Sequence, residues 1–400
     1  MNDRVGVSAQ SVDLMSDPHA PTALADLARA GGVANDVSGL LWVLRYADVE
    51  RLATDPRLHG VRLTIFDLMG ITEGPLRRWY GSLMFTNEGD EHGRLRRLVS
   101  AAFKPRAVNA LRIATREIVA ERFADLRRDG GGDLIRVFEY VPMRVMCDLL
   151  GVPHEDVPIF AAWADALSRV FLFMSPEQIA AATDAIEALL GYLDELVDQR
   201  RHQPDDDLIS ALIAAEDQGN RLTHEELLDM VANMLVAGHD TTMSQIGCTL
   251  FDLLGRPEIV AELAARPERI ASAVDETLRL QPAIFLLPRT VMEPLEIAGI
   301  TCPVGALLGL ATASANRDPS VWDRPDDFVL DRFERPGAPR LLTFGTGSHY
   351  CLGANLARMT LAEAVRGLVE NPSDPAVDLA DIEWRMVLGR SPVSLPIKLH

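Results

Sequence analysis

Cysteine is scarce in this sequence of 400 residues, and no two cysteines lie close together. None of the four belongs to a CxxC pair, which argues against a zinc site built from them. A disulfide framework is also unexpected in a long chain that shows no secretory signal. Cys147, Cys248 and Cys302 are therefore expected to be small core residues, whereas Cys351 lies in a glycine-rich stretch and needs a separate explanation.

Basic residues and long apolar runs are also few. The chain has 39 Lys and Arg against 58 Asp and Glu, so its net charge is -19, which disfavours nucleic acid and anionic membranes as general partners. No stretch approaches the ~18 apolar residues of a membrane span, and the N-terminus lacks the basic and apolar regions of a secretory signal. We therefore expect a soluble, cytoplasmic protein.

Helical periodicity dominates the chain. A capping box at Thr223 and Glu226 begins the longest expected helix, which runs to Leu254 and is followed by Gly255. Its roughly 31 residues would extend about 46 Å at 1.5 Å per residue. The middle of this helix, residues 230–238, is apolar nearly all round, which predicts that it passes through the centre of the molecule.

The other expected elements are shorter. We expect a mainly α fold with small peripheral β-sheets, in one domain over residues 1–400 with an irregular segment over 1–35. Further helices are expected over 91–103, 176–200 behind a capping box at Ser175, 268–280, and from 354 onward. Short strands are expected over 39–46, 295–300, 306–311 and 393–399, and a proline-rich loop over 315–336.

The glycine-rich stretch around Cys351 reads FGTGSHYCLG. A cysteine near a helix N-terminus is exposed to backbone N–H groups that favour the thiolate, and Gly345, Gly347 and Gly353 permit a tight loop around the sulfur. From these residues alone, Cys351 could be a nucleophile, a redox sensor, the ligand of a metal carried by an apolar macrocycle, or a buried cysteine in a turn.

This stretch resembles the haem-binding loop of the cytochrome P-450 superfamily. Phe344, Gly345, Gly347, His349, Cys351 and Gly353 fill that signature without departure. The resemblance implies that Cys351 is the axial thiolate of the iron of haem b. It also implies that His349 bonds a haem propionate and that the ring of Phe344 packs beside the sulfur. Many bacterial members have a histidine where this chain has Leu341, which removes one further propionate contact.

The segment AGHDTT, residues 237–242, lies in the middle of the long helix. Glycine costs about 1 kcal/mol relative to alanine inside a helix, and a charged Asp240 in an apolar helix needs a partner or a task. By resemblance, Thr241 hydrogen-bonds dioxygen and Asp240 relays protons. His239 occupies a variable position of the family motif and is given no role.

Two further sets of residues match the family. Glu276 and Arg279 share one helix face, and such a pair by itself is usually solvated and contributes only ~0.2–0.5 kcal/mol. The resemblance implies a buried structural network that also contains Arg332. His92, Arg96 and Arg289, which would otherwise be read as solvated basic residues, resemble the family's partners of the haem propionates.

The resemblance implies a bacterial-type haem-thiolate monooxygenase of secondary metabolism. It would insert one atom of O2 into a lipophilic small molecule, by hydroxylation or epoxidation, with electrons from NAD(P)H through a ferredoxin reductase and a ferredoxin. Two alternatives are an enzyme driven directly by peroxide and a haem protein that binds a gas without catalysis. The retained pair of Asp240 and Thr241 argues against both.

The substrate and the partner are expected at different faces. A monomer is expected, and the ferredoxin would dock on the side of Cys351 through basic residues at Arg94, Arg97, Lys104 and Arg106. Apolar residues in variable segments are candidates for substrate contact, with an ordinary place in the core as the alternative. These candidates are Ile65, Phe66, Leu83, Met84, Val170, Leu235, Val236, Ile284, Phe285, Leu286 and Leu287.

Overall fold

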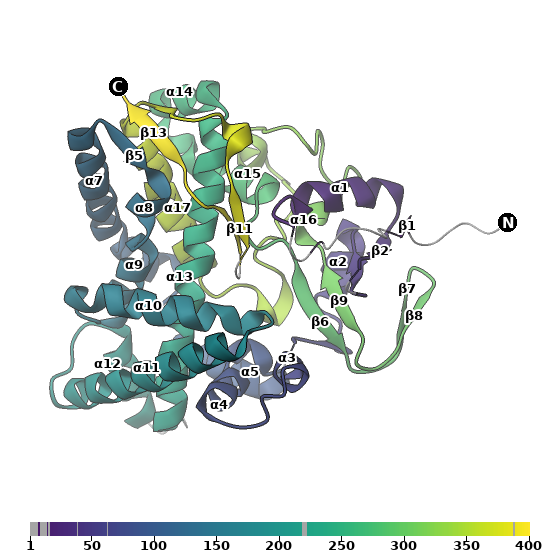
Figure 1. Ribbon diagram of the computed structural model, residues 1–400, viewed down its shortest axis with the longest axis vertical. Coiled ribbons are helices and arrows are strands. Elements are labelled where there is room, and N and C mark those ends of the chain that lie inside the picture. Colours follow the sequence, from purple (N-terminus) through teal and green to yellow (C-terminus); the bar gives the residue numbers. More distant parts are fainter. Residues whose placement is uncertain are drawn as a thin grey trace.

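The computed structural model describes residues 7–8, 14, 17–37, 39–61, 63–217, 222–386 and 389–400. Helices make up most of the molecule; one group of strands lies on the right in Figure 1, and the last strand, near the C-terminus, lies at the top. The expectation of a mainly α fold with small sheets is therefore confirmed. No helix within the described ranges is long and apolar enough to cross a membrane.

The helices carry the following bounds. They are α1 (Ala20–Ala30), α2 (Tyr46–Leu52), α3 (Thr64–Leu68), α4 (Pro75–Ser82), α5 (Gly89–Val99), α6 (Pro105–Ala110), α7 (Arg112–Asp129), α8 (Leu134–Phe138), α9 (Val141–Leu150), α10 (Val157–Ser168), α11 (Pro176–His202), α12 (Leu208–Asp217), α13 (His224–Leu254), α14 (Pro257–Ala265), α15 (Ile270–Leu280), α16 (Thr312–Ala315) and α17 (Ala354–Glu370).

Within the described residues, the strands form four small sheets. One has six strands in the order β1 (Val7–Ser8), β2 (Val33–Asn35), β3 (Leu41–Val43), β9 (Leu307–Leu310), β6 (Leu287–Val291) and β4 (Leu58–His59). A second joins β10 (Ser373–Pro375), β13 (Pro396–Leu399) and β5 (Gly131–Asp133). The two-stranded sheets pair β11 (Trp384–Met386) with β12 (Arg390–Pro392) and β7 (Leu295–Ile297) with β8 (Ile300–Cys302).

Helix α13 runs through the middle of the molecule, as Figure 1 shows. Its capping box is present: the Thr223 hydroxyl accepts the Glu226 N–H at 3.2 Å, and the Glu226 carboxylate accepts the Thr223 N–H at 2.8 Å. The helix spans the 31 residues expected from the sequence. The capping box of α11 at Ser175 is present as well.

Several expected boundaries were wrong. The strand expected over 39–46 covers only β3, and Tyr46 already begins α2. Helix α5 ends at Val99 and not at 103, because the chain turns between Ser100 and Lys104 before Pro105 begins α6. The expected strand over 295–300 is divided into β7 and β8. The turn between them places Ala298 and Gly299 at φ 49° and 81°, a left-handed conformation that strands do not tolerate.

The hydrophobic core divides along α13. Residues 230–236 of the helix belong to one buried cluster, and residues between Met243 and Leu254 belong to another. The AGHDTT segment falls between the two. The loop before α17 spans the same boundary, since Leu352 packs on the first cluster and Phe344 on the second. The core is thus interrupted where both family motifs lie.

Candidate haem and oxygen site

The loop that presents Cys351 is closed by its own backbone. The Cys351 N–H donates to the Phe344 carbonyl at 2.8 Å, and a short 3-10 turn covers Gly347–His349. Gly347 has φ 71°, and a Cβ atom there would lie only 2.6 Å from Thr54 Cγ2. Glycine is therefore required at this position by both conformation and space.

The Cys351 side chain is both accessible to solvent and affected by burial. The side chain is exposed, yet burial is the main reason why the pKa of its thiol is raised. The side chain is thus reachable by solvent and also surrounded by many protein atoms. The Gly353 N–H, Arg96 and Arg358 act in the opposite direction on this pKa, but they do not outweigh burial. The backbone N–H of Gly353 thus lowers the pKa of the thiol in the expected direction, but burial has the larger effect.

Helix α13 also has a solvent-accessible face, at Ala237 and Thr241. Ala237 is exposed and Thr241 partly exposed, although the helix on either side of them is buried. The two residues are four apart and so share one helix face. The Thr241 hydroxyl donates to the Ala237 carbonyl at 2.7 Å. The accessible face thus carries a hydroxyl group in a segment that separates the two core clusters.

Asp240, next to Thr241 in the helix, is almost completely buried, with 3% of its surface exposed. Its Oδ1 atom lies 3.7 Å from Arg385 Nη2 on β11, and the carboxylate accepts the N–H of Gly389. Among the described residues, Oδ2 has no hydrogen-bond partner. Burial raises the pKa of Asp240 despite the opposing effect of Arg385. The carboxyl group can therefore hold a proton at a higher pH than an exposed aspartate.

The residues expected at the propionates gather near the Cys351 loop. The His92 and His349 rings stack at a centroid distance of 4.1 Å, and Arg96 donates to the Tyr350 carbonyl. Arg289 is only 9% exposed, and burial lowers the pKa of its guanidinium. In the described part of the chain, no carboxylate lies within ion-pair distance of Arg289; Nη1 donates to the Pro288 carbonyl. A buried cation of this kind suits an anionic group.

Glu88 belongs to this group and was missed in the sequence. Its Oε2 atom lies 2.8 Å from His349 Nε2, and its Oε1 atom accepts the Gly60 N–H at 3.0 Å. Glu88 precedes α5 as its N-cap residue, which is an ordinary place for an acidic side chain. This position at the start of a helix was the only sign of Glu88 in the sequence, because its partner His349 is distant in the chain.

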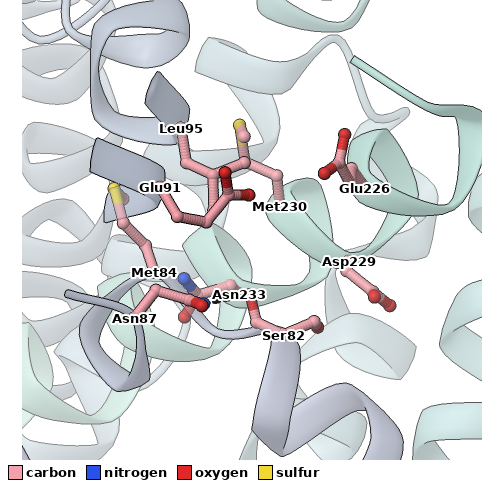
Figure 2. Close-up of a pocket in the computed structure, with 9 residues that line it drawn as sticks. All are labelled: Ser82, Met84, Asn87, Glu91, Leu95, Glu226, Asp229, Met230 and Asn233. Carbon is pink, nitrogen blue, oxygen red and sulfur yellow. Dashed lines mark hydrogen bonds between the residues drawn. The ribbon is translucent and has the colours of Figure 1, made fainter. Parts of the chain in front are cut away.

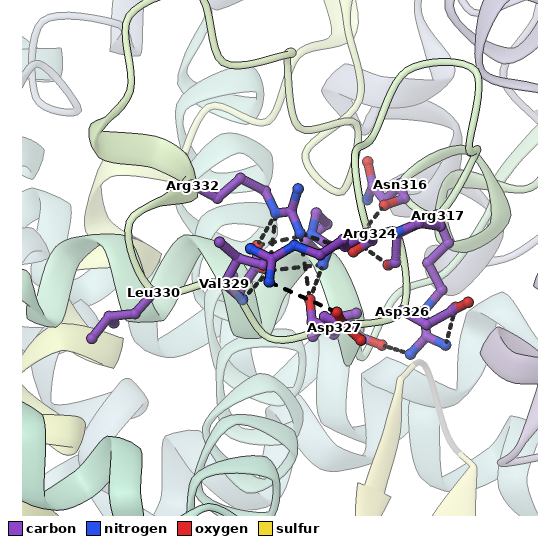
Figure 3. A network of polar contacts seen from close by, with 12 residues as sticks. Asn316, Arg317, Arg324, Asp326, Asp327, Val329, Leu330 and Arg332 are labelled. Carbon is purple, nitrogen blue, oxygen red and sulfur yellow. Dashed lines mark hydrogen bonds and ion pairs between the residues drawn. The ribbon is translucent and has the colours of Figure 1, made fainter.

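The Glu276, Arg279 and Arg332 side chains form one buried network. Arg279 donates to both Glu276 oxygens at 2.8 and 2.7 Å, and Arg332 Nε lies 3.0 and 3.1 Å from the same two atoms. Glu276 also accepts the Val329 N–H at 2.9 Å. Figure 3 shows Arg332 among the loop residues around Asp327. The network ties α15 to the loop that leads to Cys351.

The candidate substrate contacts fall into two groups. Six are buried in the core, and of these Phe285 stacks on Trp42 at 6.4 Å. The buried six are Phe66, Leu83, Val170, Leu235, Val236 and Phe285. The partly exposed five are Ile65, Met84, Ile284, Leu286 and Leu287.

Met84 lines a pocket of about 120 Å³ between the start of α5 and α13, shown in Figure 2 together with Asn233. The acidic groups of this pocket have arginine partners. Asp229 pairs with Arg78, and Glu91 and Glu226 both pair with Arg94. Arg94 was expected on a docking face, and this was wrong, because it ties α5 to the start of α13. Arg97, Lys104 and Arg106 are exposed.

Comparisons with known proteins agree on one family. The family model "Cytochrome P450" matches residues 154–266 and 270–371, more than half of the chain. The mycinamicin IV hydroxylase/epoxidase of Micromonospora griseorubida is 37% identical over 316 residues, which cover 77% of each chain. The vitamin D(3) 25-hydroxylase of Pseudonocardia autotrophica is 36% identical over 89% of this chain and 88% of its own.

Solved structures give the same result at the level of the fold. The chain superimposes on the bacillaene polyketide synthase cytochrome P450 PksS of Bacillus subtilis with a TM-score of 0.85 and 28% identity, over 96% of this chain and 100% of that one. The crystal structure of CalO2 gives a TM-score of 0.91 at 27% identity, over 98% and 99% of the two chains. This chain therefore belongs to the cytochrome P450 family, whose members are haem-thiolate monooxygenases.

Proposed function

We propose that the protein binds haem b through Cys351 and inserts one atom of O2 into a lipophilic small molecule, by hydroxylation or epoxidation. Electrons would come from NAD(P)H through a ferredoxin reductase and a ferredoxin. The observation that supports the proposal is that the accessible Cys351 and the accessible face of α13 at Ala237 and Thr241 both lie where the two core clusters separate. The relatives named as a hydroxylase/epoxidase and a 25-hydroxylase support this type of reaction.

The residues present fit a haem group. Cys351 supplies a sulfur ligand, and metal binding removes the thiol proton that burial otherwise retains. Arg289, buried without a carboxylate partner in the described chain, and Arg96 would hold the propionates together with His92 and His349. When bound, haem with a thiolate ligand supplies the oxygen chemistry and favours O–O cleavage. Cys147 and Cys302 lie far from this loop in the sequence, and both are buried in the hydrophobic core.

The chain's own task is to deliver protons and to orient the substrate. One oxygen atom enters the substrate and the other leaves as water, which consumes two electrons and two protons. The Asp240 carboxyl group, with its raised pKa, would hold a proton, and the Thr241 hydroxyl would pass it on at the accessible face of α13. The partly exposed Ile65, Met84, Ile284, Leu286 and Leu287 are the proposed apolar contacts of the substrate.

Two measurements test this function. The reduced protein under carbon monoxide should show the absorption band of thiolate ligation. Cys351→Ser should lose that band, while Cys302→Ser should keep it; a band retained by Cys351→Ser would overturn the ligand assignment.

The second measurement is product analysis, with a substrate found by a ligand-induced spectral screen. It should compare NADH, ferredoxin and ferredoxin reductase with peroxide alone. Product from peroxide alone would indicate a peroxide-driven enzyme, and no product would indicate a gas-binding protein.

A further inference from the structure

His239 connects the buried part of α13 to the protein surface. Its side chain is 4% exposed, and its Nε2 atom lies 3.3 Å from Asp165 Oδ1 on α10. The side chain of Asp165 is 64% exposed. One side of the imidazole ring therefore contacts a carboxylate that is in direct exchange with solvent.

The other side of the ring lies within the protein. The Nδ1 atom of His239 is buried and has no hydrogen-bond partner among the described residues, and the same holds for Oδ2 of the adjacent Asp240. Buried polar atoms in folded proteins are nearly always hydrogen-bonded, to protein or to ordered water. Side chains of successive helix residues point in different directions, but His239 and Asp240 are close enough to interact electrostatically. The two unpaired atoms are therefore suited to a chain of hydrogen bonds through water that joins them.

We propose that Asp165, His239 and Asp240 form a proton-uptake path that leads from solvent to the oxygen side of the proposed haem site. The proposal rests on the function proposed above, in which Asp240 holds a proton. The imidazole accepts a proton at Nε2 from the side of Asp165 and releases the proton of Nδ1 toward Asp240 Oδ2. Exchange between the two tautomers then restores the ring, so that each cycle moves one proton and no electrons.

The charges around this path favour uptake through His239. The groups are Asp165 on α10, Asp240 on α13 and Arg385 on β11, together with the N–H of Gly389. Arg385 faces Oδ1 of Asp240, the oxygen opposite the free one, and a guanidinium does not release its proton in proteins. Arg385, on the strand β11, thus gives Asp240 a fixed charge, whereas the neighbouring His239, which contacts Asp165 on α10, has an imidazole ring that can both accept and donate a proton.

Hydrogen–deuterium exchange of the Asp240 carboxyl proton tests the path directly. The holoenzyme, at a pH where Asp240 is protonated, is mixed with D2O, and the infrared band of the buried carboxyl group is followed in time; Asp240→Asn identifies the band. His239→Gln should slow the exchange by roughly a hundredfold, the low end of what a positioned proton-transfer group contributes. Asp165→Asn should slow it in the same direction. Asp184→Asn, the same change at an exposed position on α11, should leave the rate unchanged.

The exchange experiment tests the path independently of the proposed function. The exchange needs no substrate, oxygen or electron partner, whereas the function is tested by the carbon monoxide band of the wild type. Equal exchange rates in His239→Gln and wild type would overturn the path. A slowing confined to Arg385→Gln would place proton uptake on the side of β11 and would overturn it too. Should His239→Gln not fold, Asp165→Asn decides, because this side chain is exposed and its substitution leaves the core intact.

Discussion

His349 Nε2 lies 2.8 Å from Glu88 Oε2, and this contact joins the loop that carries Cys351 to the start of α5. Burial would raise the pKa of Glu88, but the hydrogen bonds from His349 and from the Gly60 N–H outweigh it and lower the pKa to about 2. The carboxylate therefore stabilises the folded state at any pH where it is ionised in the folded protein.

Glu88→Gln should change the pH dependence of stability. The pKa of Glu88 is lower in the folded protein than its ordinary value of 4.5, so its contribution is fully present above pH 4.5 and is lost as the pH falls toward 2. Removing the charge should lower the free energy of unfolding at pH 7 by about 1–2 kcal/mol, allowing for solvent screening. Urea unfolding between pH 7 and pH 3 measures this, with the exposed Glu73→Gln as control. Parallel curves for wild type and Glu88→Gln would contradict the prediction.

Glu276→Gln should act on the stability of the fold and not directly on the reaction. The substitution leaves Arg279 and Arg332 buried with no carboxylate between them, and breaking one side of a buried ion pair costs about 3–5 kcal/mol. Glu334→Gln is the matched control, because it pairs with Arg269 at the surface, where such a pair contributes at most about 1 kcal/mol. Denaturant unfolding and the yield of haem-loaded protein compare the two variants. Similar losses of stability in the two variants would contradict the larger contribution expected of the buried network.

Thr241→Ala should separate electron use from product formation. The variant keeps the apolar flanks of α13 and removes the hydroxyl that donates to the Ala237 carbonyl at the accessible face, together with the side-chain methyl group. We expect haem content and substrate binding to be retained, while the hydrogen peroxide released per NADH rises roughly tenfold, in line with the loss of a proton-transfer group. Thr241→Ser, which keeps a hydroxyl, should restore most of the coupling. Unchanged coupling in Thr241→Ala would remove the proposed role of this residue.

Arg97→Glu should slow electron delivery and leave haem and substrate binding intact. Arg97 is exposed on α5, whereas its neighbour Arg94 is engaged with Glu91 and Glu226. Attraction between a basic surface and an acidic ferredoxin accelerates association by a factor of roughly ten or more at low salt, and salt screens it. Ferredoxin-supported turnover of wild type should thus fall toward that of the variant as salt is raised. Arg128→Glu, on the exposed end of α7, is the control; equal rates for Arg97→Glu and wild type at low salt would exclude this docking face.

What the sequence by itself determined is local. The capping boxes at Thr223 and Ser175 and the length of α13 were predicted because a helix is specified by side chains three and four residues apart. The loop motif around Cys351 was recognisable for the same reason, since its glycines and its cysteine act within ten residues. The turn inside 295–300 was missed because strand periodicity over so few residues does not reveal a reversal of the chain.

The tertiary structure alone decided which side chains meet. Glu88 and His349 are 261 residues apart, and Arg94 and Glu226 are 132 apart, and contacts over such separations leave no periodic pattern in the sequence. The contact between His239 and Asp165 belongs to the same class. Protonation was decided in the same way: the raised pKa of the Cys351 thiol depends first on burial, and burial is a property of the packed elements around a residue and not of its neighbours in the chain.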